Sequence, residues 1–129
     1  MTTFRQLLVN NGIAYKESNN SSLDEWFSSI LDIPINDLGV GDIARAIRQD
    51  LFLGDVLPRA EAILKLDPLA GEDYDGQLIS SIASLEHSEV KEFLAAFKRI
   101  SYFLNHLDKS SLDKQIVIDI EKINKASHF

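Results

Sequence analysis

The residues that most often catalyse reactions or hold metals are few in this chain and are poorly spaced. The sequence has no cysteine, which excludes thiolate nucleophiles, disulfides and cysteine-bound zinc. Its three histidines are His87, His106 and His128, and none stands three or four residues from another, as paired helical metal ligands do. We therefore expect no metal and no other cofactor, and we predict surface or helix-capping roles for the histidines.

Two other clusters have the residue types of a ligand site without its spacing. Residues 39–41, Gly-Val-Gly, are half of a phosphate loop, but the third glycine and the preceding strand are missing, so we predict a turn. Glu72, Asp73 and Asp75 do not fit the spacing of a twelve-residue EF-hand loop. Motifs of serine hydrolases, P-loop proteins and zinc peptidases do not occur. We predict no catalytic residues and no enzyme activity.

The same acidic cluster suits a protein interface better than a metal site. Tyr74 stands among the acids, and a tyrosine offers a flat apolar ring with a polar tip. The alternative is that Tyr74 packs inward while the acids cap the next helix, with Asp75 the best placed of them.

Charge is distributed unevenly along the chain, whose formal net charge is −7. Residues 17–92 carry 16 acidic and 5 basic side chains, whereas residues 1–16 and 93–129 together carry 4 acidic and 8 basic ones. An acidic surface repels phosphate backbones, so we expect no direct binding of nucleic acid, and it attracts basic proteins. It can also serve only to keep a protein dissolved, and charge alone does not separate these two roles.

The elements that must position these residues are all predicted to be helices. We expect an all-α fold, a compact single-domain bundle of six or seven helices over residues 1–129, because no convincing strand pair or repeat occurs. Capping patterns begin helices at Thr3, Ser22 and Asp42. Pro58 is expected in the first turn of the following helix, which ends at Asp67.

The strongest helical periodicity lies in the C-terminal third of the chain. Apolar residues between positions 90 and 107 predict one continuous helix of about five turns. A last helix is expected to begin at residue 110 or 111, although the isoleucines at 116, 118 and 120 also alternate as in a strand. The predicted core includes the side chains of Trp26, Phe93, Phe97, Ile100 and Leu104.

The N-terminus does not have the pattern of a secretion signal. Its longest apolar run, Leu7 to Val9, is too short, and no stretch of the chain approaches the roughly 18 apolar residues that span a bilayer. We therefore expect a cytoplasmic protein that does not bind membranes.

Residues 34–82 carry three short motifs. Arg48-Gln49 stands on one predicted helix and Leu57-Pro58-Arg59-Ala60 on the next, and the third motif runs from Asp67-Pro68-Leu69 through Gly71, Tyr74 and Gly76 to Leu78. Together they resemble a family of immunity proteins from bacterial contact-dependent growth inhibition systems. The chain departs from the family pattern at Asp73, where a large apolar residue is common, and at Gln77, where an acid is common.

The resemblance implies a cytoplasmic protein that binds and blocks the C-terminal toxin domain delivered by sibling cells. Such toxins are frequently nucleases, often acting on tRNA, and a nuclease cleft is basic because it binds phosphates. An acidic inhibitor fits such a cleft. We expect the toxin to contact the acidic surface at Glu72, Asp73, Tyr74, Glu86 and Glu89.

The motif residues themselves have structural explanations, and we expect scaffold roles for Arg48, Gln49, Pro58, Pro68 and Gly76. Arg48 is predicted to pair with an acid of the turn that follows Asp67. A second interpretation of the whole chain is a helical adaptor or regulatory subunit that binds an endogenous basic protein. A third, an enzyme with a carboxylate site, has no nucleophile or metal cluster to support it.

Overall fold

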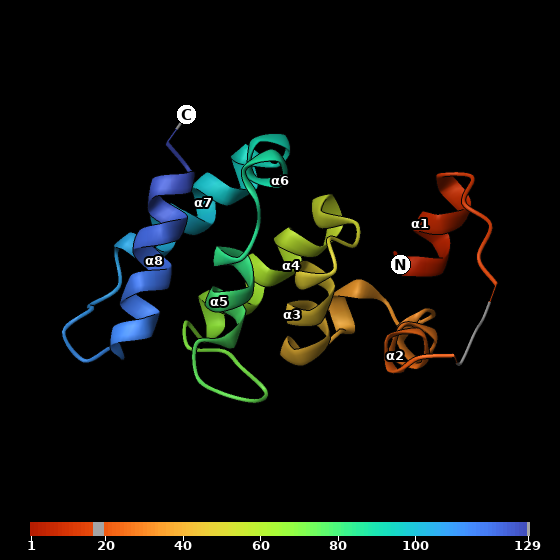
Figure 1. The fold of residues 1–129 in the computed structure, drawn as a ribbon, viewed down its shortest axis with the longest axis horizontal. Coiled ribbons are helices and arrows are strands. Elements are labelled where there is room, and N and C mark those ends of the chain that lie inside the picture. Colours follow the sequence, from red (N-terminus) through yellow and green to blue (C-terminus); the bar gives the residue numbers. More distant parts are fainter. Residues whose placement is uncertain (17–19, 129) are drawn as a thin grey trace.

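A computed structural model describes residues 1–16 and 20–128, and every regular element in that part of the chain is a helix (Figure 1). The predicted all-α class is therefore confirmed, with eight α-helices and one short 3₁₀ helix in the described ranges instead of six or seven helices. They are α1 (Phe4–Asn10), α2 (Ser22–Ile30), η1 (Ile35–Asp37), α3 (Val40–Arg48), α4 (Leu53–Leu66), α5 (Gln77–Ala83), α6 (His87–Glu92), α7 (Leu94–Asn105) and α8 (Lys114–Ala126).

The helices are arranged around a central group formed by α3, α4 and α5. Helix α5 packs against α3 and α8, while α4 packs against α3 and α7. Figure 1 shows α7 and α8 at one end of the long axis and α1 and α2 at the other. The alternation of isoleucines at 116, 118 and 120 therefore lies on a helix, α8, and not on a strand. No helix in the described ranges has the length and apolar character needed to cross a membrane.

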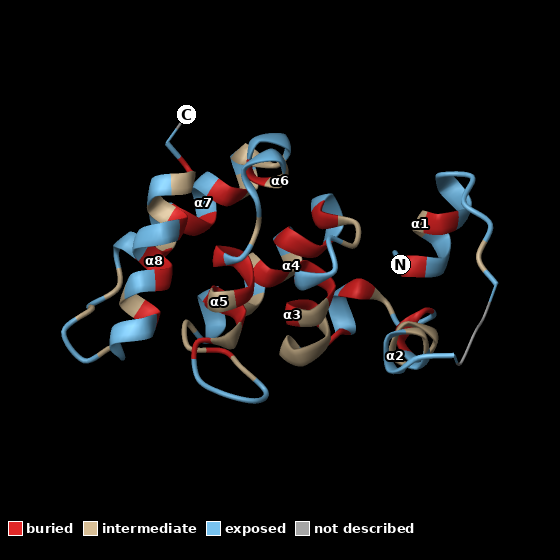
Figure 2. Cartoon of the chain, in the orientation of Figure 1, coloured by how far each residue is buried: buried red, intermediate tan, exposed pale blue. Residues whose placement is uncertain are grey.

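One continuous apolar core joins these helices, and its buried residues lie on their inward faces (Figure 2). Phe97, Ile100 and Leu104 are at most 1% exposed, so their predicted place in the core is confirmed. Trp26 and Phe93 are only partly buried, and for them the prediction was wrong.

Trp26 stays near the surface because both its indole N–H and its aromatic ring have polar partners there. Its indole N–H donates to Asp42 Oδ1 at 2.9 Å, and the guanidinium of Arg45 lies 4.8 Å from the ring centroid. A cation over the face of an aromatic ring is attracted by the negative charge of that face, so both polar contacts hold the indole beside α3. Helical periodicity records only that a residue is apolar, so it does not detect this arrangement.

The single long helix predicted for residues 90–107 is wrong, because the chain breaks between α6 and α7 at Phe93. The backbone of Phe93 leaves the helical region at φ −113° and ψ 35°. Its ring lies beside Gly54 of α4, where a β-carbon on the glycine would come within 3.2 Å of the ring. Residues 90–107 contain neither proline nor glycine, so no local signal announces this break.

The first two predicted helix starts differ in accuracy. The hydroxyl of Thr3 accepts the N–H of Gln6 at 3.1 Å, which confirms the cap of α1. Helix α2 is capped by Ser21, whose hydroxyl accepts the N–H of Asp24 at 3.1 Å, and not by Ser22. The error is one residue, because two adjacent serines offer the same capping chemistry.

Three further starts lie earlier or later than predicted. Helix α3 begins at Val40 after Gly39, so Asp42 lies in its first turn and is not the cap. Helix α4 begins at Leu53, which places Pro58 in the second turn and not in the first, although the predicted end at Asp67 is confirmed. Helix α8 is capped by Asp113, later than the predicted residue 110 or 111.

Candidate partner-binding surface

The turn between α4 and α5, residues 67–76, holds three of the residues predicted to contact a partner. Its ends are joined by backbone hydrogen bonds, in which Gly76 N–H donates to Leu69 O and Leu78 N–H donates to Ala70 O, at 3.0 and 3.1 Å. A side chain at Gly71 would overlap the carbonyl of Tyr74. The turn therefore has a defined conformation that brings its acids and its tyrosine to the surface.

Gly76 begins α5 and has two reasons to be a glycine. Its φ is +85°, a conformation that other residues rarely adopt, and it is the N-cap in place of the predicted Asp75. A β-carbon at this position would also come within 2.7 Å of Ile116 on α8. The turn is thus fixed against α8 at this point.

The side chain of Gln77 holds the tip of the turn. Its Oε1 accepts the N–H groups of Glu72 and Asp73 at 2.7 and 3.1 Å, and its Nε2 donates to Asp73 Oδ2 at 3.2 Å. The two positions at which the chain departs from the family pattern therefore contact each other. An acid at position 77 would repel Asp73, whereas the amide of glutamine can both accept and donate.

Arg48 connects α3 with α5 and with the turn, but not through an acid as predicted. Its Nε donates to Ser81 Oγ at 2.9 Å, and its Nη2 donates to the hydroxyl of Tyr74 at 3.0 Å and to Ser80 Oγ at 3.4 Å. The prediction of its partner was wrong: the three acceptors are hydroxyl groups, and the carboxylate of Glu72 lies beside Gly41 at the other end of α3.

Glu72 lies over the first turn of α3, where a β-carbon on Gly41 would overlap its carboxylate. The N-terminus of a helix carries a partial positive charge, so this position stabilises a carboxylate. Glu72 therefore has an intramolecular role in addition to its exposed surface. Tyr74 is 50% exposed, so its ring is neither packed inward nor free of the protein.

Glu86 and Glu89, the other two predicted contact residues, form a capping box at the start of α6. The N–H of Glu86 donates to Glu89 Oε1 at 3.4 Å, and Ser88 Oγ donates to Glu89 Oε2 at 2.6 Å. The Ser88 hydroxyl lowers the pKa of Glu89. Partial burial and the negative charges of Glu89 and Glu86 raise the pKa of Asp50, which lies beside them.

The structure does not bring the five predicted residues into one patch. Glu72, Asp73 and Tyr74 lie before α5, and Glu86 and Glu89 follow it at its opposite end (Figure 1). Two separate acidic groups result, one on the turn and one at the start of α6.

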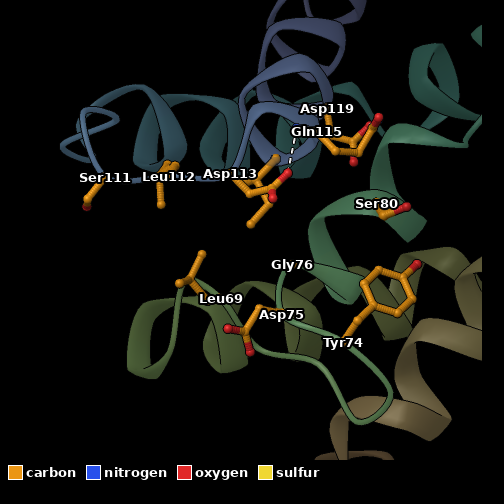
Figure 3. Close-up of a pocket in the computed structure, with 11 residues that line it drawn as sticks. Leu69, Tyr74, Asp75, Gly76, Ser80, Ser111, Leu112, Asp113, Gln115 and Asp119 are labelled. Atoms are coloured by element: carbon orange, nitrogen blue, oxygen red, sulfur yellow. Dashed lines mark hydrogen bonds between the residues drawn. The ribbon is translucent and has the colours of Figure 1, made fainter.

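Two hollows flank Tyr74. The smaller, of about 380 Å³, lies between α3 and the turn and includes Trp26, Arg45 and Arg48. The larger, of about 630 Å³, lies between the turn and the start of α8 (Figure 3). Its lining includes Asp113 and Asp119, which the sequence analysis did not single out. Within the described ranges, no group of three or more histidine or acidic side chains is placed to hold a metal ion.

The comparison with known protein families gives one match. Residues 8–100 match the family described as CDI immunity proteins, and this segment includes α2 to α6 and the whole turn. No curated protein matches the chain. The match extends beyond the segment 34–82 that carries the motifs, while α8 lies outside it.

Proposed function

The chain belongs to the CDI immunity protein family, and on this premise we propose that it captures one cognate toxin domain in the cytoplasm of the producing cell. Members of the family are toxin inhibitors and not enzymes, so the activity of this protein is binding. We propose further that the toxin is a basic nuclease, with tRNA a candidate substrate, and that the protein binds neither nucleic acid nor membranes directly.

The observation that supports a basic partner is the charge of the matched segment. Residues 17–92 carry 16 acidic and 5 basic side chains and lie entirely within the match. A nuclease binds phosphates through a basic cleft, so opposite charges would accelerate the encounter of the two proteins. The family match favours this function over that of an adaptor for an endogenous basic protein, which composition alone left open.

We propose that the interface is centred on the turn, at Glu72, Asp73 and Tyr74, and extends to Glu86 and Glu89. Tyr74 suits an anchor because its ring is half exposed while its hydroxyl is already held by Arg48. A standard interface covers about 800 Å² on each partner, which is enough to include both ends of a two-turn helix such as α5.

The first experiment is protection in cells. Cells that express this protein are expected to survive the toxin encoded beside it, and survival should fail with a toxin from an unrelated locus. Protection requires that nearly all toxin be bound, so we expect a Kd of about 1 nM or lower. Absence of protection against the neighbouring toxin would show that the functional proposal is wrong.

The second experiment tests the acidic surface. The association rate should fall as salt is added, while the dissociation rate changes less. Asp73→Lys should slow association more than Asp37→Lys, a matched reversal of an exposed acid on η1. Glu72 is left intact because its carboxylate lies over α3. Equal association rates for the two variants would show that the turn is not part of the interface, and the proposed immunity function would stand.

A further inference from the structure

The groove between α4 and α7 combines apolar surface with basic side chains. It has a volume of about 510 Å³ and is mainly apolar, and its lining includes the rings of Tyr102 and Phe103 and the side chains of Glu61, Lys65, Lys98 and Arg99. Tyr102 is 69% exposed, although an aromatic ring stabilises a protein most when it is buried. The groove therefore offers apolar area that no described part of the chain covers.

The groove is positively charged because its one acid is already paired. The carboxylate of Glu61 lies 3.0 Å from Lys65 Nζ and 3.1 Å from Arg99 Nε, so two cations share one negative charge. The side chain of Lys98 forms no ion pair or hydrogen bond with a described residue. A groove with an excess of positive charge attracts an acidic segment by charge complementarity.

The turn between α4 and α5 has the chemistry that this groove requires. Asp73 and Asp75 flank the ring of Tyr74, and all three residues are exposed. Figure 1 shows the turn as a loop at the margin of the helices. The turn is bonded to Arg48 of α3 and Gln77 of α5, whereas the groove lies between α4 and α7. It can therefore enter a groove only on a second copy of the chain.

We propose that the groove binds the turn of a second copy of this chain. The ring of Tyr74 packs against Tyr102, while Asp73 and Asp75 face Lys98 and the other cations of the groove. The two surfaces differ, so each copy can give its turn to one neighbour and accept a turn in its own groove. The basic toxin domain proposed above is a poorer occupant, because its charge has the same sign as that of the groove.

This self-association is weak and reversible. Each copy has a net charge of −7, which opposes approach, but at physiological salt the repulsion between exposed charges more than about 8 Å apart is largely screened. Direct pairs between the turn and the groove are closer than this distance and persist. One turn in one groove covers less area than a standard interface, so we expect a Kd of about 10–100 μM.

The test measures the self-association of the full chain by analytical ultracentrifugation at increasing protein concentration. Lys98→Glu and Asp75→Lys should each raise the Kd about tenfold or more, because each brings like charges together. The matched controls are Lys122→Glu on α8 and Asp37→Lys on η1, which make the same charge changes at exposed positions away from both surfaces. The Kd of each control should stay within about twofold of wild type.

A mixture of the two reversed variants shows whether the groove and the turn meet each other. Lys98→Glu keeps the acidic turn and Asp75→Lys keeps the basic groove, so the mixture should associate although neither variant does so alone. Recovery in the mixture also shows that both variants are folded. The proposal is wrong if wild type stays monomeric up to about 1 mM, if the variants associate as their controls do, or if the mixture gains nothing over its components. None of these outcomes affects the proposed immunity function.

Discussion

Single residues of the turn between α4 and α5 combine structural and surface roles. Gln77 and Arg48 fix the turn from inside through hydrogen bonds to Asp73 and Tyr74. Asp73 and Tyr74 remain exposed on its outer side. The toxin domain that we propose to bind here would meet a surface that is already ordered, which would lower the entropy lost on binding.

At the residue scale, Asp50 gives a prediction about pH. Partial burial, then Glu89 and Glu86, raise its pKa above the ordinary value, so the folded state holds the proton more tightly than the unfolded state. Stability from this group is present at low pH and is lost as pH rises through the raised pKa. Asp50→Asn should therefore raise the free energy of unfolding at pH 7 by about a few tenths of a kcal/mol, and with it the melting temperature. Near pH 3 the substitution should have little effect.

Asparagine suits this position because Asp50 has φ +55°, a region that asparagine tolerates. Asp32→Asn is the control with the opposite sign. The hydrogen bond from Arg5 lowers the pKa of Asp32, so its contribution to stability is present above the ordinary pKa of aspartate and is lost as pH falls. Thermal melts of both variants from pH 3 to 7 provide the measurement, and a destabilised Asp50→Asn at pH 7 would contradict the argument.

At the scale of elements, the residue at which a helix begins is set by its capping group more than by the spacing of apolar residues. Thr3, Ser21 and Asp113 each accept an N–H from the first turn of the helix that they begin. Gly39 and Gly76 begin α3 and α5 without a side-chain acceptor. The starts of these two helices are instead set by the backbone conformation before them and by packing.

The two serines before α2 allow a direct test of the cap. Ser21→Ala should lower the free energy of unfolding by about 1 kcal/mol, because the N–H of Asp24 loses its acceptor. Ser22→Ala is the matched control, since Ser22 is the first helical residue and alanine favours helices, so its effect should be near zero or stabilising. Urea denaturation of both variants measures the difference. Equal losses would contradict the assignment of Ser21 as the cap.

At the scale of the whole molecule, the apolar core extends from Phe4 on α1 to Ile123 on α8 without interruption. The ring centroid of Phe4 lies 5.6 Å from that of Phe27 and 6.1 Å from that of Phe52, so α1 is joined to α2 and to the loop before α4. The α7–α8 end is joined through the contacts of α4 with α7 and of α5 with α8. We therefore propose that the chain unfolds as one domain.

This proposal can be tested with a core substitution and two probes. Phe97→Ala should lower the stability by about 3–5 kcal/mol, because Phe97 is 1% exposed and its ring is removed from a packed core. Trp26 is the only tryptophan and lies on α2, far along the chain from α7. Its fluorescence and the far-UV circular dichroism should therefore shift to the same lower urea midpoint. Separate midpoints would indicate that the two ends unfold independently.

The sequence by itself determined the helical class, the ordered turn between α4 and α5 and the family. It did so because helical periodicity, caps and turn residues act over a few neighbouring positions, which is the range that sequence patterns record. The end of α4 at Asp67 and the cap at Thr3 were predictable for this reason.

Only the tertiary structure decided which distant residues meet. The break at Phe93 accompanies its packing beside Gly54, and Arg48 bonds to Tyr74 while Glu72 lies beside Gly41 at the other end of α3. The predicted surface was likewise divided, since α5 separates Tyr74 from Glu89. Asp75 meets Asp113 and Asp119 in one pocket only because α8 packs against α5. These contacts depend on how whole helices pack against one another, and the pattern of neighbouring residues along the chain does not specify that packing.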